Sequence, residues 1–223
     1  MTGQDPLRVV VADDEALFRS GLTLIVESEP DLVVVAEAVD GHEAVAVVRA
    51  HRPDVILMDI QMPRMDGIAA TAAIAELNLP TRVLVLTTFG RDQLVYEALR
   101  AGASGYLLKT VPPAHLVQAV RSIAAGETLL APSLTRRLIE DWVRRPRPDA
   151  HHPRLAELTP REREVLSLVG RGLSNREIAA ELHLSESTVK THLARVLTKT
   201  RSRDRVQAVV LAYESGVVAA GQH

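Results

Sequence analysis

The chain has 223 residues, enough for two ordinary domains, and a net charge of −2. Apolar residues make up 47% and aromatic residues 3%, which predicts packed aliphatic cores, and the absence of cysteine excludes disulfides and thiolate metal sites. The N-terminus lacks a signal-peptide pattern and no apolar run approaches the roughly 20 residues that cross a bilayer, so we expect a soluble, cytoplasmic protein without a membrane partner.

The first 130 residues alternate short apolar runs with helical patterns five times. We expect strands near 8–12, 32–38, 55–59, 82–87 and 105–108, and helices near 15–28, 41–50, 67–77, 91–101 and 113–125. Continuous runs rich in Val and Ile are typical of parallel strands that are buried on both faces. The predicted fold class is therefore α/β, with a (βα)5 doubly wound parallel sheet in a first domain of residues 1–130.

The alternation of strand and helix patterns ends near residue 130. A helix near 132–144 and a proline-rich stretch up to residue 153 make residues 131–153 the expected linker. Residues 154–223 show only helical patterns and form the second predicted domain, which is all-α. Helices there begin after the capping residues Thr159, Ser174 and Ser185, and a short turn joins the last two, as in a helix-turn-helix.

Charge differs between these regions. Residues 1–130 hold 10 Lys and Arg against 17 Asp and Glu, whereas residues 131–153 hold 5 against 3 and residues 154–223 hold 11 against 8. An acidic front and a basic back predict different partners for the two domains. The basic excess is modest, so by itself it is weak evidence for nucleic-acid binding.

Polar residues end or directly follow four of the expected strands: Asp13, Asp59, Thr87 and Lys109, with Asp14 beside the first. Because parallel strands end at one edge of a sheet, these side chains should converge. Carboxylates suit Mg²⁺, and one of them can act as a nucleophile toward a phosphoryl group that Thr87 and Lys109 would bind. Each residue alone is more simply a solvated strand end, but four of them on four strands favour a site.

These residues stand in motifs that resemble the receiver domain of two-component response regulators: VVVADDE at 9–15, VILMDIQMPRMDG at 55–67, LTTF at 86–89 and AGASGYLLK at 101–109. The resemblance spans residues 7–127. It implies that Asp59 is the phosphoacceptor and that Thr87 and Tyr106 form a switch pair, while Lys109 binds the phosphoryl group. It implies an Mg²⁺ site made by Asp13, Asp14, Asp59 and the backbone carbonyl of Gln61.

Two further expectations concern the loops beside this site. Lys109 precedes Thr110, and a cis bond before a residue other than proline costs about 2.5–4 kcal/mol, so we expect a trans bond. Phe89 lies two positions beyond Thr87, and we predict that its bulk hinders the water that would hydrolyse a phosphorylated Asp59.

The outward face of the third capped helix carries Thr188, Lys190, Thr191, Ala194 and Arg195. Lys and Arg can contact guanine edges or phosphates, and Thr and Ala methyl groups can contact thymine. A basic helix face alone is more often a solvated surface. The order of caps, turn and helix nevertheless favours a reader helix that enters the major groove of DNA.

The motifs LTPREREVL at 158–166, SNREIA at 174–179 and STVKTH at 187–192 resemble the LuxR-type helix-turn-helix, and the whole chain resembles the NarL/FixJ family. The resemblance implies base contacts by Lys190, Thr191 and Ala194. It implies phosphate contacts by Ser185, Ser187, Thr188, Lys199 and Arg205. The family often has Gly where Arg201 stands, so a left-handed Gly cap is missing and the end of the reader helix is predicted only to within a turn. Residues 206–215 would be a dimer helix by resemblance, or would simply close a small core.

The resemblance implies a transcriptional regulator and not an enzyme. A histidine kinase would phosphorylate Asp59, and a homodimer would bind an inverted repeat in promoter DNA, with RNA polymerase as a further candidate partner. Two alternatives stay open. One is an Mg²⁺-dependent phosphohydrolase, which would need a general acid where Gln61 stands. The other is a regulator that binds DNA without phosphorylation.

Overall fold

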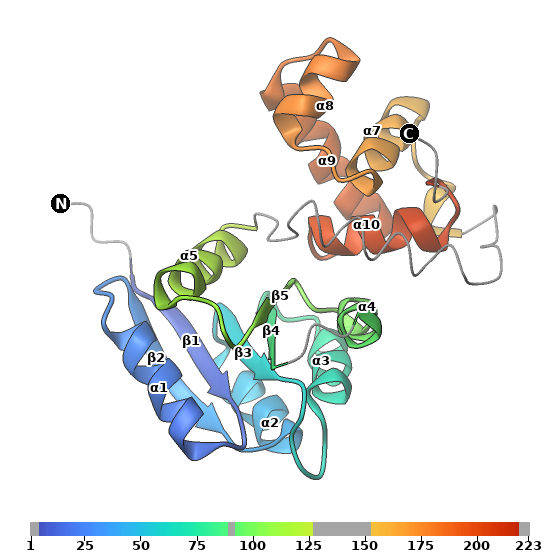
Figure 1. Cartoon of the computed structure of the whole chain (residues 1–223). Helices are drawn as coiled ribbons and strands as arrows, with labels where there is room; N and C mark the ends of the chain where they lie inside the picture. The colour runs from blue at the N-terminus through green and yellow to red at the C-terminus, as the bar shows by residue number, and fades with distance from the viewer. Residues whose placement is uncertain (1–4, 89–91, 127–152, 219–223) are drawn as a thin grey trace. The chain divides into compact units, whose positions relative to one another are not determined.

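The computed structural model describes residues 5–88, 92–126 and 153–218, and the chain divides into two compact units, Met1–Leu129 and Leu130–His223 (Figure 1). The helix expected near 132–144, the proline-rich stretch up to residue 152 and Phe89 lie outside the described residues. None of the helices in the described ranges combines the length and the apolar character that a bilayer span requires.

The first unit contains a five-stranded parallel sheet in the order β2-β1-β3-β4-β5. The strands are β1 (Leu7–Ala12), β2 (Leu32–Ala38), β3 (Val55–Asp59), β4 (Arg82–Thr87) and β5 (Gly105–Leu108). Their apolar runs explain the arrangement, because β3 is buried along its whole length and so are five of the six residues of β4. The predicted parallel sheet is confirmed.

Helices cover both faces of this sheet, as Figure 1 shows. They are α1 (Ala16–Glu27), α2 (Gly41–His51), α3 (Gly67–Glu76), α4 (Asp92–Ala101) and α5 (Pro113–Ala124). Apolar residues of α1 and α5, such as Val26 and Val120, pack with β-strand residues such as Val11 in one aliphatic core. On the other face α3 packs against α2 and α4. The chain order reverses between β1 and β3, so ligands should bind where these two strands end.

The second unit is helical, as predicted, with a short 3-10 turn η1 (Pro153–Leu155) before α7 (Pro160–Gly170), α8 (Asn175–Leu182), α9 (Glu186–Thr200) and α10 (Arg205–Glu214). Capping boxes at Thr159 and Ser174 begin α7 and α8. Residues of α10, among them Leu211 and Tyr213, belong to the apolar core of this unit. The helix expected near 206–215 therefore helps to close the small core.

Two backbone expectations have clear outcomes. No peptide bond is cis among the described residues, so the bond between Lys109 and Thr110 is trans, as predicted. Helix α9 ends at Thr200, and Arg201 caps it with a φ of 52°, in the left-handed conformation. An arginine thus adopts the conformation for which glycine is favoured, at a cost of roughly 1–2 kcal/mol.

Candidate functional site

Three carboxylates meet at the carboxyl ends of β1 and β3. Asp13, Asp14 and Asp59 each place an oxygen within 4.8 Å of the others. Asp13 and Asp59 are buried, whereas Asp14 is exposed, so the cluster faces solvent on one side only. The two strands pair directly in the sheet, which is why residues 45 positions apart come together. The convergence expected from the strand ends is present.

Lys109 follows β5 and brings a positive charge to this cluster. Its Nζ lies 2.6 Å from Asp13 Oδ2 and 3.2 Å from Asp59 Oδ2, and its side chain is 5% exposed. Burial alone would lower the pKa of Lys109, but the hydrogen bond to Asp13 and the charge of Asp59 outweigh it and raise the pKa. The two carboxylates therefore favour the charged form of Lys109.

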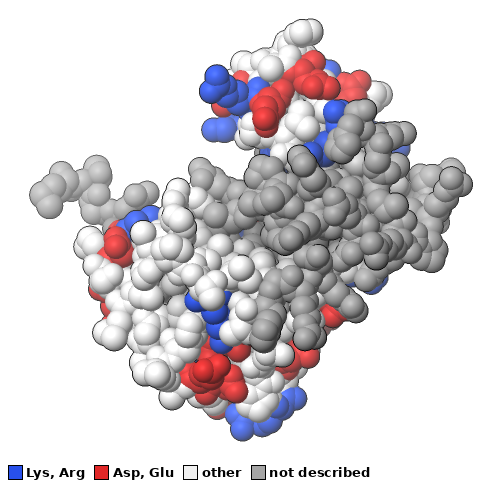
Figure 2. Space-filling view, viewed as in Figure 1, with Lys and Arg blue, Asp and Glu red and all other residues white. Residues whose placement is uncertain are grey.

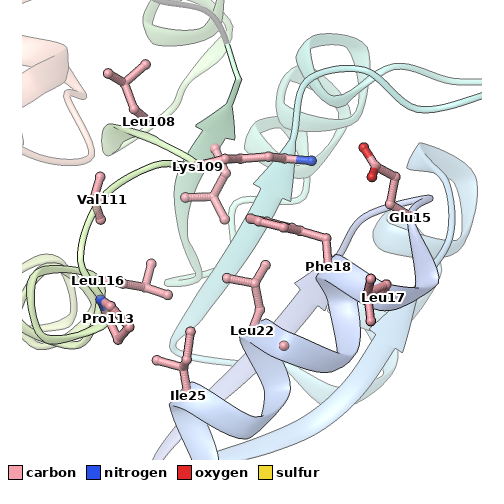
Figure 3. A pocket seen from close by; sticks show the side chains of 12 residues that line it. Glu15, Leu17, Phe18, Leu22, Ile25, Leu108, Lys109, Val111, Pro113 and Leu116 are labelled. Carbon is pink, nitrogen blue, oxygen red and sulfur yellow. The ribbon is translucent and has the colours of Figure 1, made fainter.

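The ring of Phe18 supports this ammonium from α1. Lys109 Nζ lies 4.5 Å from the centroid of the Phe18 ring, a cation–π distance. Figure 3 shows the two side chains one above the other, at the end of an apolar groove of about 270 Å³ between α1 and the segment after β5. Phe18 was not among the candidate residues, because no motif marks a contact between a helix and a distant strand end.

Asp59 is an unusual carboxyl group. Burial raises the pKa of Asp59 to about 6, and the charge of Asp13 adds to that rise, while Lys109 and a hydrogen bond from the Gln61 backbone N–H oppose it. Burial therefore makes the ionised form of Asp59 costly. A divalent cation would offset that cost, and an all-oxygen donor set of this kind suits Mg²⁺.

Thr87 and Tyr106 lie on neighbouring strands. Tyr106 pairs with Val85 and Leu108 pairs with Thr87, so Tyr106 and Thr87 project from the same face of the sheet. Both are buried, with exposed fractions of 3% for Thr87 and 6% for Tyr106. Gln61 lies exposed in the loop between β3 and α3, two residues after Asp59. Thr87 and Gln61 thus lie at or just beyond the carboxyl ends of their strands, as the carboxylates do, whereas Tyr106 lies level with Val85, two residues before the end of β4.

Helices α8 and α9 of the second unit form a helix-turn-helix. His183 ends α8 in the left-handed conformation, with a φ of 53°, and Ser185 caps α9 by accepting from Thr188 N at 3.1 Å. Val189, Leu193 and Val196 face the core. The candidate contacts Lys190, Thr191, Ala194 and Arg195 are exposed on the opposite face. Helix periodicity thus separates the two sets, as the sequence predicted.

Charge on this unit is mixed. The face seen in Figure 2 carries acidic side chains beside basic ones and has no uniform basic patch. Ser185, Ser187 and Thr188 cluster at the start of α9, where Ser185 Oγ lies 2.8 Å from both Ser187 Oγ and Thr188 Oγ1. Hydroxyl groups beside exposed N–H groups at a helix N-terminus are typical phosphate ligands.

Lys199 and Arg205 have partners inside the unit. Lys199 Nζ lies 2.7 Å from Glu162 Oε2, and this bond lowers the pKa of Glu162. Arg205 donates to Asn175 Oδ1 at 2.8 Å and to the carbonyl of Leu173. These two candidate phosphate contacts therefore tie helices together within the unit. Nothing local marked these pairs, which join residues 37 and 30 positions apart.

Known proteins share both units. Residues 9–121 match the response regulator receiver domain, and residues 156–212 match the bacterial regulatory proteins of the luxR family. The chain is 43% identical over 216 residues to the uncharacterized transcriptional regulatory protein YxjL of Bacillus subtilis, covering 96% of this chain and 99% of that one. It is 35% identical to the nitrate/nitrite response regulator protein NarL of Escherichia coli K12, covering 97% and 100%.

A solved structure agrees with these relatives. The signal receiver domain of the response regulator NarL from Mycobacterium tuberculosis is 42% identical, with a TM-score of 0.55, and covers 56% of this chain and all of that one. The family matches of both units, their order in the chain and the near-complete alignment to known regulators all indicate one family. The chain belongs to the NarL/FixJ family of two-component response regulators, transcriptional regulators in which a receiver domain is followed by a LuxR-type DNA-binding domain.

Proposed function

We propose that this regulator is switched by phosphorylation of Asp59 by a histidine kinase. The observation that carries the proposal is the meeting of Asp13, Asp14 and Asp59 with the Lys109 ammonium in one largely buried cluster. One Asp59 oxygen would form a bond to phosphorus while the P–N bond to the donor's phosphohistidine breaks. The leaving imidazole keeps the bonding electron pair and takes up a proton.

The donor set fits Mg²⁺, a hard cation that prefers oxygen ligands. Asp14, Asp59 and the Gln61 carbonyl would hold it, with Asp13 fixing its position. When bound, the cation supplies charge neutralisation between the carboxylates and the incoming phosphoryl oxygens. Lys109 would pair with one phosphoryl oxygen, and the Thr87 hydroxyl would donate to another.

Thr87 and Tyr106 would report the change to the surface of the receiver. They share one face of the sheet, so a shift of Thr87 toward the phosphoryl group frees space on the side of Tyr106. The added charge is a local electrostatic event that biases an element with two positions.

Phosphorylation would then favour a homodimer. Leu17 and Leu24, seven residues apart on α1, have exposed fractions of 89% and 70%. Leu17 also lines the apolar groove between α1 and the segment after β5, so this side of α1 offers an apolar surface of the kind that marks protein–protein contacts. A two-fold dimer would bind an inverted repeat in promoter DNA with half-sites about one helical turn apart. Lys190, Thr191 and Ala194 would read the bases, Arg195 would contact DNA from the same face, and RNA polymerase is a further candidate partner.

The test uses the full chain with Mg²⁺ and a small phosphodonor such as acetyl phosphate. Intact mass should show one adduct on the wild type and none on Asp59→Asn. The same samples should differ in sedimentation and in affinity for promoter DNA at a stated salt concentration. Continuous release of phosphate would instead support the phosphohydrolase. An absent adduct with unchanged DNA binding would support a regulator that works without phosphorylation.

A further inference from the structure

The loop between β3 and α3, residues 60–66, carries an ion pair that the chemistry above does not use. Arg64 donates through Nε and Nη2 to Oδ2 of Asp40, the N-cap residue of α2. The other Asp40 oxygen accepts from Glu43 N at 2.8 Å. The Asp40 side chain is only 1% exposed. A carboxylate buried to that extent depends on its cationic partner, because an unpaired buried charge is strongly destabilising.

Arg64 makes this pair from an unfavourable backbone conformation. Its φ is 64°, in the left-handed region that favours glycine. Met65 N donates to Pro63 O at 2.7 Å, so Arg64 stands at the centre of a three-residue turn. Such turns with a positive central φ are rare and strained. Strain of this kind persists only where the surroundings over-determine it, and the ion pair to Asp40 is such a constraint.

The same loop is fastened close to Asp59. Gly41 N donates to Met65 O at 3.0 Å, and Gly67 N donates to Ile60 O at 2.9 Å. The backbone N–H of Gln61 donates to the Asp59 carboxylate. The Gln61 carbonyl therefore belongs to a short segment that is held at one end by Asp59 and at the other by the contacts to α2.

We propose that Arg64 is a positioning residue for the cation site. Its ion pair with Asp40 anchors the loop to the start of α2, so that the Gln61 carbonyl and the Asp59 carboxylate face the same divalent cation. Mg²⁺ demands near-ideal octahedral geometry, so a loosened carbonyl ligand weakens its binding. This inference rests on the proposed function, because it takes the cation to be Mg²⁺.

The experiment compares Arg64→Ala with Arg121→Ala in the full-length protein. Arg121 pairs with Glu29 and Asp31, which precede β2. These residues lie at the amino ends of the parallel strands, whereas the cluster lies at the carboxyl ends. Both variants lose one positive charge. Calorimetric titration with Mg²⁺ should show about a tenfold weaker affinity for Arg64→Ala, the lower end of the loss seen for outer-shell partners of metal ligands. Arg121→Ala should match the wild type.

The sign of the change separates positioning from bulk charge. Removal of a cation near a carboxylate cluster should by electrostatics alone strengthen Mg²⁺ binding, whereas a loosened loop weakens it. Asp40→Asn should also weaken Mg²⁺ binding while asparagine still caps α2, but its lost negative charge acts in the same direction, so the Arg64 variants carry the test of sign. The double variant should show little further loss, since both changes break the same pair.

A measurement without cation tests the anchor itself. Amide hydrogen exchange at Gly41 and Gly67 should accelerate in Arg64→Ala, because their N–H groups bond to the anchored loop. Arg64→Gly, which removes the side chain and relieves the backbone, should show the same acceleration and the same weaker Mg²⁺ binding even if Arg64→Ala folds poorly.

Equal or tighter Mg²⁺ binding by the Arg64 variants, with the wild type binding normally, would overturn the positioning role and leave the proposed function standing. Unchanged exchange at Gly41 and Gly67 would overturn it as well. A wild type that binds no Mg²⁺ would overturn the proposed cation site, and the positioning role with it.

Discussion

Lys109 Nζ lies closer to Asp13 Oδ2, at 2.6 Å, than to Asp59 Oδ2, at 3.2 Å. The ammonium thus stabilises two buried carboxylates in one site. It supplies part of the positive charge that a divalent cation would otherwise supply. Lys109 lies farther from Asp59 than from Asp13, and Asp59 is the residue proposed to accept the phosphoryl group.

Lys109→Gln should therefore bind Mg²⁺ more tightly and accept a phosphoryl group more slowly. The first effect follows because a competing positive charge is removed, and the second because a phosphoryl oxygen loses its countercharge. Calorimetry and the rate of adduct formation measure the two separately. Lys199→Gln, in the other unit, is the charge-matched control, and weaker Mg²⁺ binding by Lys109→Gln would contradict this account.

Titration of Asp59 should lower the stability of the metal-free protein as pH rises from about 4 to about 6. Burial raises the pKa of Asp59 from 3.8 to about 6. Between those values the folded state keeps a proton that the unfolded state has lost, so the free energy of unfolding decreases with pH, by about 3 kcal/mol at most. Urea unfolding in a chelating buffer checks this. Asp59→Asn should lack the decrease, and Mg²⁺ should restore stability at neutral pH.

Gly67→Ala should destabilise the receiver unit by about 3 kcal/mol, in the range of severe steric changes. A Cβ at residue 67 would lie 1.8 Å from the carbonyl oxygen of Asp59, so backbone beside the phosphoacceptor must move. Gly21→Ala is the matched control, because a Cβ there has no neighbour within 4 Å. Alanine within α1 should raise stability by about 0.5–1 kcal/mol. Thermal unfolding of both variants decides whether the difference is steric.

Lys199→Met should lower the stability of the DNA-binding unit more than it weakens DNA binding. Lys199 pairs with Glu162, whose side chain is 3% exposed and also completes the cap of α7. A double-mutant cycle with Glu162→Gln should give a coupling energy of about 1 kcal/mol or more. If Lys199 instead contacts a DNA phosphate, the salt dependence of DNA binding will drop by about one unit of slope, with stability unchanged.

Lys190→Ala should weaken binding to the specific promoter site by about 1–3 kcal/mol and leave binding to random DNA nearly unchanged. Lys190 is exposed on the outward face of α9, where a side chain can reach base edges. Ser187→Ala, at the start of the helix, should weaken binding to both DNAs alike, because a phosphate contact carries no sequence information. Fluorescence anisotropy at one salt concentration compares them. An equal loss on both DNAs for Lys190→Ala would make it a phosphate contact.

Much of the receiver fold follows from local pattern. The five strands and five helices of the first unit lie within two residues of the expected bounds, because a strand buried on both faces must be a continuous apolar run. The α9 face was predictable for a similar reason, since helix periodicity alone separates Val189 and Leu193 from Lys190 and Thr191.

Contacts between distant side chains were not predictable in this way. The bond between Arg64 and Asp40 spans 24 residues, and the one between Lys199 and Glu162 spans 37. Phe18 beneath Lys109 is another such contact. The local sequence does not distinguish a solvated arginine, lysine or phenylalanine from a paired one. The partner of such a side chain depends on how whole helices and strands pack together.

The sequence by itself determined which residues end the strands, and strand order then implied that Asp13, Asp14, Asp59 and Lys109 would share one edge of the sheet. In the helix-turn-helix, the helical periodicity likewise predicted which residues face the core and which face solvent. Only the tertiary structure decided the environment of the groups at the sheet edge. Asp59 is buried enough for its pKa to rise to about 6, and Lys109 lies closer to Asp13 than to Asp59. Burial and distance depend on every element packed around a site, and no local stretch of sequence contains them.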